Sequence, residues 1–243
     1  VDLNEACFGT ERDISVESAV ACTKCNGQGS ADASAPAMCQ VCKGRGETQQ
    51  VQRSFLGQVM TSRPCSACQG FGSVIQNPCR ECAGDGRVRA RQNINVKIPA
   101  GVETGNRIQL AGRGEVGAGG GPAGDLYEEI VEAEHPFLIR DGHNLHVAIE
   151  VSFAAASLGT KVKVECLDGE IEVEVRAGTQ SGATIPVRGK GMTRLRAATR
   201  GDLIVHVEVQ TLHKLNREQE ELLRKFAAAC GEKPGDVKIK GLE

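Results

Sequence analysis

One eight-residue motif, Cys-x-x-Cys-x-Gly-x-Gly, occurs four times between residues 22 and 86 of this 243-residue chain. Two cysteines three positions apart in a glycine-rich turn can direct both thiolates at one metal ion. Four such pairs complete two sites of four cysteines each, which is the closed tetrahedral arrangement of structural zinc. Iron–sulfur clusters also take four cysteines, but repeated two-ligand turns favour zinc. The motif therefore predicts two Zn²⁺ ions per chain.

The segment between the second and third motifs indicates which pairs share a metal ion. Residues 47–63 have the pattern of two extended segments around a turn near Gly57. A hairpin there returns the chain to its own start and brings the two middle pairs together. A sequential pairing, first with second and third with fourth, remains possible but leaves this hairpin unexplained. We predict the nested pairing, with one site formed by Cys22, Cys25, Cys79 and Cys82 and the other by Cys39, Cys42, Cys65 and Cys68.

The remaining sequence gives little sign of export or of a membrane. Cys7, Cys166 and Cys230 lie outside the motif and are interpreted as buried or unpaired small apolar residues. No apolar run approaches the roughly 18 residues of a membrane span, and no charged-then-apolar leader opens the chain. Zinc thiolates require reduced cysteines, so we expect a soluble, cytoplasmic protein. The formal net charge of −2 gives no general argument for a nucleic-acid or membrane partner.

A second, less visible repeat predicts the domain organisation. An offset of 77 in the numbering places 94–98 on 171–175, 108–114 on 185–191 and 124–126 on 201–203. Upstream the offset becomes 150, so that Val1 falls on Val151 and Gly9 on Gly159. The difference between the two offsets is close to the length of the cysteine-rich segment. We therefore predict two related domains, with the zinc module inserted into a hairpin loop of the first.

Both copies of this repeat have the period of half-buried strands. Ile94, Val96 and Ile98 alternate with polar residues. Aromatic residues are only 3% of the chain, so its cores must be built from aliphatic side chains, and its 30 glycines indicate many tight turns between short strands. Only 215–230 is predicted as a helix, with Asn216 as its N-cap. The predicted fold is mainly β: two tandem, related β-sandwich-like domains, a Cys-rich zinc hairpin module inserted in the first, and a short C-terminal helix. The expected boundaries are 1–21 with 92–136, 22–91, 137–212 and 213–243.

Three groups of residues carry a resemblance to a known family. The four motifs, then Ile98-Pro99-Ala100-Gly101-Val102, then Pro122-Ala123-Gly124-Asp125-Leu126-Tyr127, closely resemble the bacterial DnaJ co-chaperones, which are class A J-domain proteins. The resemblance covers essentially the whole chain. The family's N-terminal J-domain, with its His-Pro-Asp signature, is absent, and His135-Pro136-Phe137 is not that signature. The expectation is a fragment carrying the zinc region and both C-terminal domains.

The resemblance implies binding rather than catalysis. In the family, an extended apolar segment of an unfolded or nascent polypeptide adds as a strand beside the first β domain and places a large side chain in a hydrophobic depression. The chain would then deliver clients to a DnaK-type chaperone, and the full-length protein would form a homodimer. The residues that match the family's substrate-binding strands are Ile14, Val16, Ile94, Ile108, Leu110 and Leu126.

Parts of the sequence are also compatible with two other classes of function. Cys-x-x-Cys pairs are redox active in thiol–disulfide oxidoreductases and isomerases, but there the motif occurs once, at a helix start in a βαβ unit. Nucleic-acid binding is suggested by residues 22–91, which carry nine Lys and Arg against four Asp and Glu. A solvated zinc module, whose cations offset its thiolates, explains that balance better. No nucleophile–base pairing can be found in the chain, and no catalytic residue is predicted.

Overall fold

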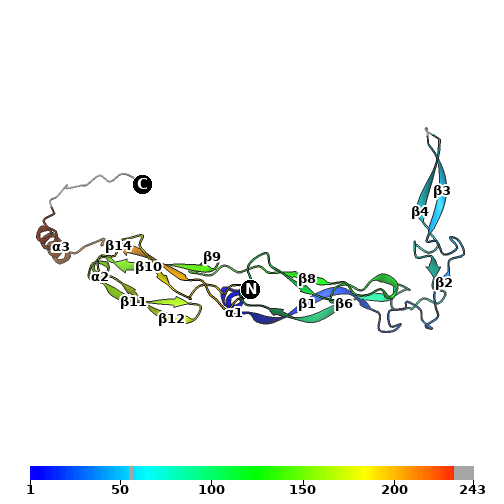
Figure 1. Ribbon diagram of the computed structural model, residues 1–243, viewed down its shortest axis with the longest axis horizontal. Helices are drawn as coiled ribbons and strands as arrows, with labels where there is room; N and C mark the ends of the chain where they lie inside the picture. Colours follow the sequence, from blue (N-terminus) through cyan, green and yellow to red (C-terminus); the bar gives the residue numbers. More distant parts are fainter. Residues whose placement is uncertain (55–56, 233–243) are drawn as a thin grey trace. The chain divides into compact units, whose positions relative to one another are not determined.

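The computed structural model describes residues 1–54 and 57–232, and the chain in it divides into two compact units (Figure 1). The first unit consists of Val1 and Phe8–Ala133. The second consists of Asp2–Cys7 and the chain from Glu134 onward. Strands make up most of the regular structure of both units, so the predicted mainly β fold is confirmed.

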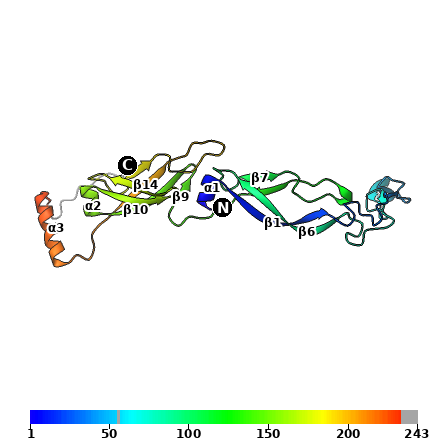
Figure 2. The same ribbon diagram turned by 90° about the horizontal axis from the view of Figure 1, so that it is seen from below.

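The first unit is built on two antiparallel strand pairs. Strand β1 (Thr10–Ala21) pairs along its whole length with β6 (Arg87–Ile98), and the two strands lie side by side in both views (Figure 1, Figure 2). Strand β7 (Arg107–Leu110) pairs with β8 (Leu126–Glu129), and a short 3-10 helix, η1 (Ala118–Gly120), lies between them in the chain. The core of this unit contains Ile94, Val96, Ile98, Val102 and Ile130. The alternation seen in the sequence places the side chains of Ile94, Val96 and Ile98 on one face of β6.

The cysteine-rich segment is the part of the first unit that connects β1 to β6. Within it, β2 (Ala37–Met38) pairs with β5 (Ser73–Val74), and β3 (Glu47–Ser54) pairs with β4 (Gly57–Pro64). The hairpin predicted over 47–63 is therefore confirmed. Residues 55–56, between its two strands, lie outside the described residues.

The second unit contains a four-stranded sheet and a separate hairpin. The sheet has the order β13 (Thr184–Val187), β14 (Leu203–Gln210), β10 (Asn144–Ser152), β9 (Ile139–Asp141), with β10 and β14 parallel. The hairpin is β11 (Thr160–Cys166) with β12 (Gly169–Val175). Fully buried aliphatic side chains fill the core, namely Leu145, Val175, Met192, Leu203, Val205 and Val207.

The elements of the two units correspond residue for residue at the two offsets found in the sequence. Adding 77 to the bounds of β7 gives β13, and adding 77 to the second half of β6, 92–98, gives β12. Adding 150 to the first half of β1, 10–16, gives β11. Helix α1 (Leu3–Phe8) likewise maps onto α2 (Phe153–Leu158) at the offset of 150, although residues Leu3–Cys7 of α1 belong to the second compact unit. The internal repeat is therefore a repeat of structure as well as of sequence.

Helix α3 (Arg217–Ala229) confirms the one helix predicted from the sequence. The Asn216 side chain accepts a hydrogen bond from the Gln219 backbone N–H, and the Gln219 side chain accepts one from the Asn216 N–H. Helices α1 and α2 were not predicted from the sequence, because a six-residue helix spans less than two turns and shows no clear period. None of the helices among the described residues combines the length and apolarity needed to span a membrane.

Candidate metal centres and neighbouring pockets

The eight motif cysteines form two groups of four thiols. Within each group the four sulfurs lie within 4.8 Å of one another, and every cysteine is buried. We call them the outer group, Cys22, Cys25, Cys79 and Cys82, and the inner group, Cys39, Cys42, Cys65 and Cys68. The structure thus brings the thiols together in the nested order, first motif with fourth and second with third.

Backbone pairing explains why the motifs meet in this order. The last pair of the β1–β6 ladder is Ala21 with Arg87, and the Cys22 N–H then donates to the Gly86 carbonyl at 2.9 Å. Across the same group the Cys79 N–H donates to the Gly29 carbonyl at 2.8 Å. The inner group repeats this arrangement at the base of the β3–β4 hairpin, with Cys39 donating to Gly72 and Cys65 to Gly46. Each group therefore closes a strand pair.

The last glycine of each motif aims a backbone N–H at a sulfur. The Gly29 N–H donates to Cys25 Sγ at 3.2 Å, and the other three motifs repeat this bond at 3.2–3.3 Å. Gly29 has φ +78°, and a Cβ built there would lie 2.4 Å from the Gly84 carbonyl oxygen. Only glycine fits this turn, because a side chain would collide with the partner motif. Such N–H···S bonds stabilise thiolate ligands.

The thiols of each group have opposite acid–base tendencies. Backbone N–H groups, that of Cys42 first, lower the pKa of Cys39 to about 7, and the N–H of Cys82 does the same for Cys79. Burial raises the pKa of Cys25 and of Cys68 to about 11. One thiol of each group therefore favours the thiolate, while another loses its proton only against the cost of burial. A bound cation would remove that conflict.

The spacing of the sulfurs fits a tetrahedral metal site. The sulfur–sulfur distances across the groups are 3.6–4.0 Å. Four sulfurs at about 2.3 Å from a central Zn²⁺ would be about 3.8 Å apart. All eight cysteines are free thiols rather than disulfides. Each group could therefore hold one metal ion, and a donor set of four sulfurs suits zinc.

A carboxylate joins the two segments that connect the outer and inner groups. Asp32 accepts hydrogen bonds from the Ser30 and Ser34 hydroxyls, each at 2.6 Å, and from the Asn77 amide at 2.7 Å. These bonds, that of Ser30 first, hold the pKa of Asp32 well below its usual range. The sequence analysis did not identify this network, because Asp32 and Asn77 are far apart in the chain and follow no motif.

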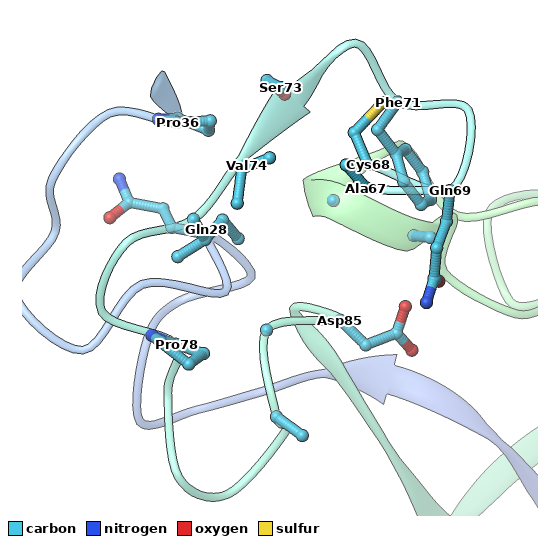
Figure 3. Close-up of a pocket in the computed structure, with 15 residues that line it drawn as sticks. Gln28, Pro36, Ala67, Cys68, Gln69, Phe71, Ser73, Val74, Pro78 and Asp85 are labelled. Atoms are coloured by element: carbon cyan, nitrogen blue, oxygen red, sulfur yellow. The ribbon is translucent and has the colours of Figure 1, made fainter. Parts of the chain in front are cut away.

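An open pocket of about 670 Å³ lies beside this connection. Figure 3 shows Pro36 and Phe71 near its upper rim with Val74 between them, and Asp85 on the opposite side. Ala118 and Gly119, from the loop after β7, also line it. Phe71 is 65% exposed, so this pocket carries an apolar side chain facing solvent. No motif in the sequence pointed to it.

The six predicted substrate-binding residues have different surroundings in the first unit. Ile14 lines a pocket of about 220 Å³ together with Val96 and Ile98, and Val16 follows on the same strand and is half-buried. Ile94 is buried at 4% exposure. The other three lie on the β7–β8 pair and are half-buried, namely Ile108, Leu110 and Leu126. Of the six, only Ile14 reaches this pocket.

Aromatic side chains in this protein lie at the surface rather than in the core. All six Phe and Tyr residues whose side chains the structure describes are 38–65% exposed. They are Phe8, Phe71, Tyr127, Phe137, Phe153 and Phe226. These side chains are therefore available for contact with other molecules.

The three cysteines outside the motif do not form a further site among the described residues. Cys7 and Cys166 are buried and Cys230 is exposed. The Cys7 thiol lies 3.4 Å from the Thr193 hydroxyl, and the Cys166 thiol donates to the Gly169 carbonyl at 3.1 Å. Both buried thiols thus have local polar contacts.

Comparison with known proteins gives a consistent result over nearly the whole chain. The family described as "DnaJ C terminal domain" matches residues 1–211. Chaperone protein DnaJ 2 of Streptomyces avermitilis is 60% identical over 232 residues, which are 96% of this chain and 61% of that protein. Chaperone protein DnaJ 1 of Mycolicibacterium paratuberculosis is 51% identical over 239 residues, 98% of this chain and 63% of that protein. The chain thus spans about three fifths of the length of these relatives.

Proposed function

This chain belongs to the family of DnaJ C-terminal domains, and from that premise we propose that it binds exposed hydrophobic segments of unfolded polypeptides. The observation that carries the proposal is the exposure of every described aromatic side chain in a protein whose cores are aliphatic. Apolar side chains presented to solvent gain free energy when an apolar segment covers them. The relatives are named chaperone proteins, which agrees with binding rather than catalysis.

We further propose that the first β domain, residues 1–21 and 92–136, provides the main groove. The pocket beside Ile14 is lined mostly by apolar side chains, with Arg12, Glu128 and Glu129 also on its wall, and its volume of about 220 Å³ would accept one large side chain. A client segment would add as a strand, with its backbone bonds tolerant of sequence and the pocket selecting an apolar residue. Val16, Ile94, Ile108, Leu110 and Leu126 would support this groove from the neighbouring strands.

In the cysteine-rich segment we propose two structural zinc ions, one in each cysteine group. With all four protein ligands supplied, neither site would leave a position open for a substrate. The metal would supply folding energy to a segment that has few apolar residues of its own. In the longer protein we propose delivery of clients to a DnaK-type chaperone, a homodimer and a cytoplasmic location.

The primary experiment measures aggregation of a chemically denatured client as it is diluted into buffer with or without this chain. Suppression at near-stoichiometric ratios, together with two zinc ions per chain by elemental analysis of the same sample, would support the proposal. A chain that leaves aggregation unchanged while containing both metal ions would refute client binding but keep the zinc assignment.

A single substitution tests the assignment of ligands. Cys39→Ser should remove the metal of the inner group and leave that of the outer group, so that the content falls from two ions to one. Loss of the metal bound by Cys22 instead would contradict the grouping.

The alternative thiol–disulfide activity requires the thiols to cycle between reduced and oxidised forms, so it predicts reduction or isomerisation of a disulfide substrate that is lost in the same variant. The nucleic-acid alternative predicts binding of an oligonucleotide that weakens steeply with salt.

A further inference from the structure

Two loops in equivalent positions of the repeat share one backbone conformation. The first loop is 112–124 and the second loop is 189–201, its equivalent at the offset of 77. At the base of each loop two glycines share a hydrogen bond of 2.8 Å, Gly114 to Gly124 and Gly191 to Gly201. Near the tip, Gly117 donates to Pro122 and the matching Arg194 donates to Thr199. A further isolated bridge repeats in both loops.

The tip of the first loop binds another segment of the chain. The Val116 N–H donates to the Ala19 carbonyl at 2.9 Å, and the Gly119 N–H donates to the Asp85 carbonyl at 3.0 Å. The Arg87 side chain donates to the Val116 carbonyl at 3.0 Å. The first loop therefore holds the base of the cysteine-rich segment mainly through its backbone groups, with an ion pair of 3.5 Å between Glu115 and Arg89 beside them.

In the second loop Thr193, the equivalent of Val116, lies 3.4 Å from the Cys7 thiol through its hydroxyl, but the residues beyond it have no such occupant in the part of the chain that the structure describes. Residues 194–199 make backbone hydrogen bonds only to one another. Where the first loop has Gly117 and Gly119, the second has Arg194 and Arg196, both exposed. Leu195 lies between them and is 40% exposed. The second copy of the loop thus presents two cations and an apolar side chain where the first copy binds protein.

The second loop and the residue before it, Arg188, carry a concentrated positive charge that is only partly neutralised. Of the thirteen residues 188–200, five are Lys or Arg and none is Asp or Glu. Arg200 donates twice to Asp168, at 2.7 and 2.8 Å, and Lys190 lies 3.4 Å from the same carboxylate. No ion pair is found for the other three within the described ranges; they are Arg188, Arg194 and Arg196. The β11–β12 hairpin, by contrast, pairs its two lysines Lys161 and Lys163 with glutamates.

The tip is also fixed in shape before anything binds. The Ala197 N–H donates to the Arg194 carbonyl at 3.0 Å, which closes a tight turn with Arg196 at φ +61°. Its counterpart Gly119 has φ +68°. An arginine is thus held in the left-handed region, where glycine carries no steric cost. The base is held by the Asp168 ion pairs and by a bond from Met192 N–H to the His143 carbonyl at 2.9 Å. Such preorganisation reduces the entropy lost on binding.

We propose that the tip of the second loop, Arg194–Arg196, binds an acidic segment of another polypeptide that carries at least two carboxylates and an apolar side chain. Guanidinium groups match carboxylates in a bidentate geometry, and Leu195 offers the apolar contact between them. The tip has no aromatic side chain on which a base could stack, which favours a polypeptide over a nucleic acid. The site is separate from the proposed client groove of the first unit.

Fluorescence anisotropy with two labelled peptides tests this proposal on the full 243-residue chain. The probes are Glu-Asp-Leu-Asp-Glu and its amide counterpart Gln-Asn-Leu-Asn-Gln, compared at low ionic strength, where charge attraction is least screened. The acidic peptide should bind about tenfold or more tightly than the amide peptide, since each lost charge-assisted bond costs that order of affinity. Arg194→Ala with Arg196→Gly should weaken binding by a similar factor.

The matched control removes the same charge from the same unit. Lys161→Gln with Lys163→Gln takes two cations from β11 and should leave binding of the acidic peptide unchanged. Equal binding of both peptides, or an equal loss in the control, would overturn the proposal. Preferential binding of a single-stranded oligonucleotide that competes off the acidic peptide would overturn it in favour of a nucleic acid. Arg196→Gly introduces the residue that the first loop has at the equivalent position, Gly119, so the turn should be kept. If the melting temperature of the double variant is unchanged, a loss of binding cannot be assigned to misfolding.

Discussion

The two hairpins of the repeat, β1–β6 and β11–β12, are the same structure closed in two ways. In the second unit Cys166 pairs with Gly169 and two residues form the turn. In the first unit the ladder ends at Ala21 with Arg87, and the whole cysteine-rich segment stands in place of the turn. The strands keep the same residue correspondence in both units. The alternating apolar residues of the strands therefore determine the frame, and the connection can vary if its ends stay at strand spacing.

The two closures are stabilised by different interactions. A two-residue turn loses little chain entropy on closing, and its Asp168 is tied to the equivalent loop by charge. The long insertion loses more, and its base is held by the outer cysteine group and by backbone bonds to the first loop. A metal ion in the outer group would thus take the place of the turn. In each unit the neighbouring loop contacts the segment that closes the hairpin, which is the base of the cysteine-rich segment in the first unit and the turn with Asp168 in the second.

The largest test of this comparison is removal of metal. Chelation should unfold residues 22–86 while both β frames persist, because the segment's buried residues are mostly its cysteines. Hydrogen exchange followed by mass spectrometry should show loss of protection in the cysteine-rich segment and at the end of β1 next to Ala21. The β11–β12 hairpin provides the internal control and should keep its protection. Simultaneous loss of protection in both hairpins would show that the module and the frames fold as one unit.

The cysteine spacing was the most informative part of the sequence, because metal-ligand spacing is local. Four identical turns and one intervening hairpin sufficed to predict the nested order in which the thiols lie. The sequence repeat also corresponds to a repeat of structure, because the equivalent apolar side chains of β6 and β12 have to face a core in both units. These features depend on short-range pattern or on exact duplication, both of which can be found in one sequence.

Other features depend on contacts between distant segments and left no local pattern. The parallel pairing of β10 with β14 and the Asp32–Asn77 bond connect residues with no periodic relation. The sequence repeat did place Arg196 on Gly119, but charge alone does not show that the first tip is covered and the second is open. Only the structure supplies the contacts that distinguish the two loops.

A charged residue at equivalent positions of the two hairpins should have unequal effects. Val164, the counterpart of Ile14 at the offset of 150, is 3% exposed, whereas Ile14 is half-buried and lines the pocket. Val164→Asp should destabilise the second unit by several kcal/mol, because its carboxylate would be buried without a partner. Ile14→Asp should cost less stability but abolish binding of an apolar peptide.

Thermal melting and peptide affinity should therefore be measured on both variants. A melting temperature that falls equally in the two would assign Ile14 to the core rather than to a groove. Peptide binding retained in a folded Ile14→Asp variant would place the client site elsewhere in the chain.

The ion pairs of Asp168 with Arg200 and Lys190 should make the stability of the second unit depend on pH more than that of the first, whose loop is held mainly by backbone hydrogen bonds. Burial favours the neutral acid of Asp168, but the hydrogen bond and charge of Arg200, with Lys190, outweigh it and lower the pKa. The free energy of unfolding that these ion pairs contribute is thus fully present above the pKa of Asp in the unfolded chain, about 3.9. It is lost as the pH falls through the lower pKa of Asp168 in the folded protein. Asp168→Asn should cost about 1 kcal/mol at neutral pH and less under acid conditions. Urea unfolding at pH 7 and pH 3 measures both differences; a constant difference would contradict this assignment.

The smallest expected effect comes from exchanging the residues at the two loop tips. Arg196→Gly relieves a left-handed arginine but adds chain entropy to the unfolded state, so it should stabilise the second unit by only about 0.5 kcal/mol. Gly119→Arg should do the reverse in the first unit, since no atom lies within 4 Å of the added Cβ and only the backbone conformation opposes it. Denaturant midpoints of the two variants should therefore move in opposite directions, which is easier to detect than either shift alone. Shifts of the same sign would mean that the tips, despite their matching φ angles, are not equivalent in energy, and that the loop of one unit has adapted to what it binds.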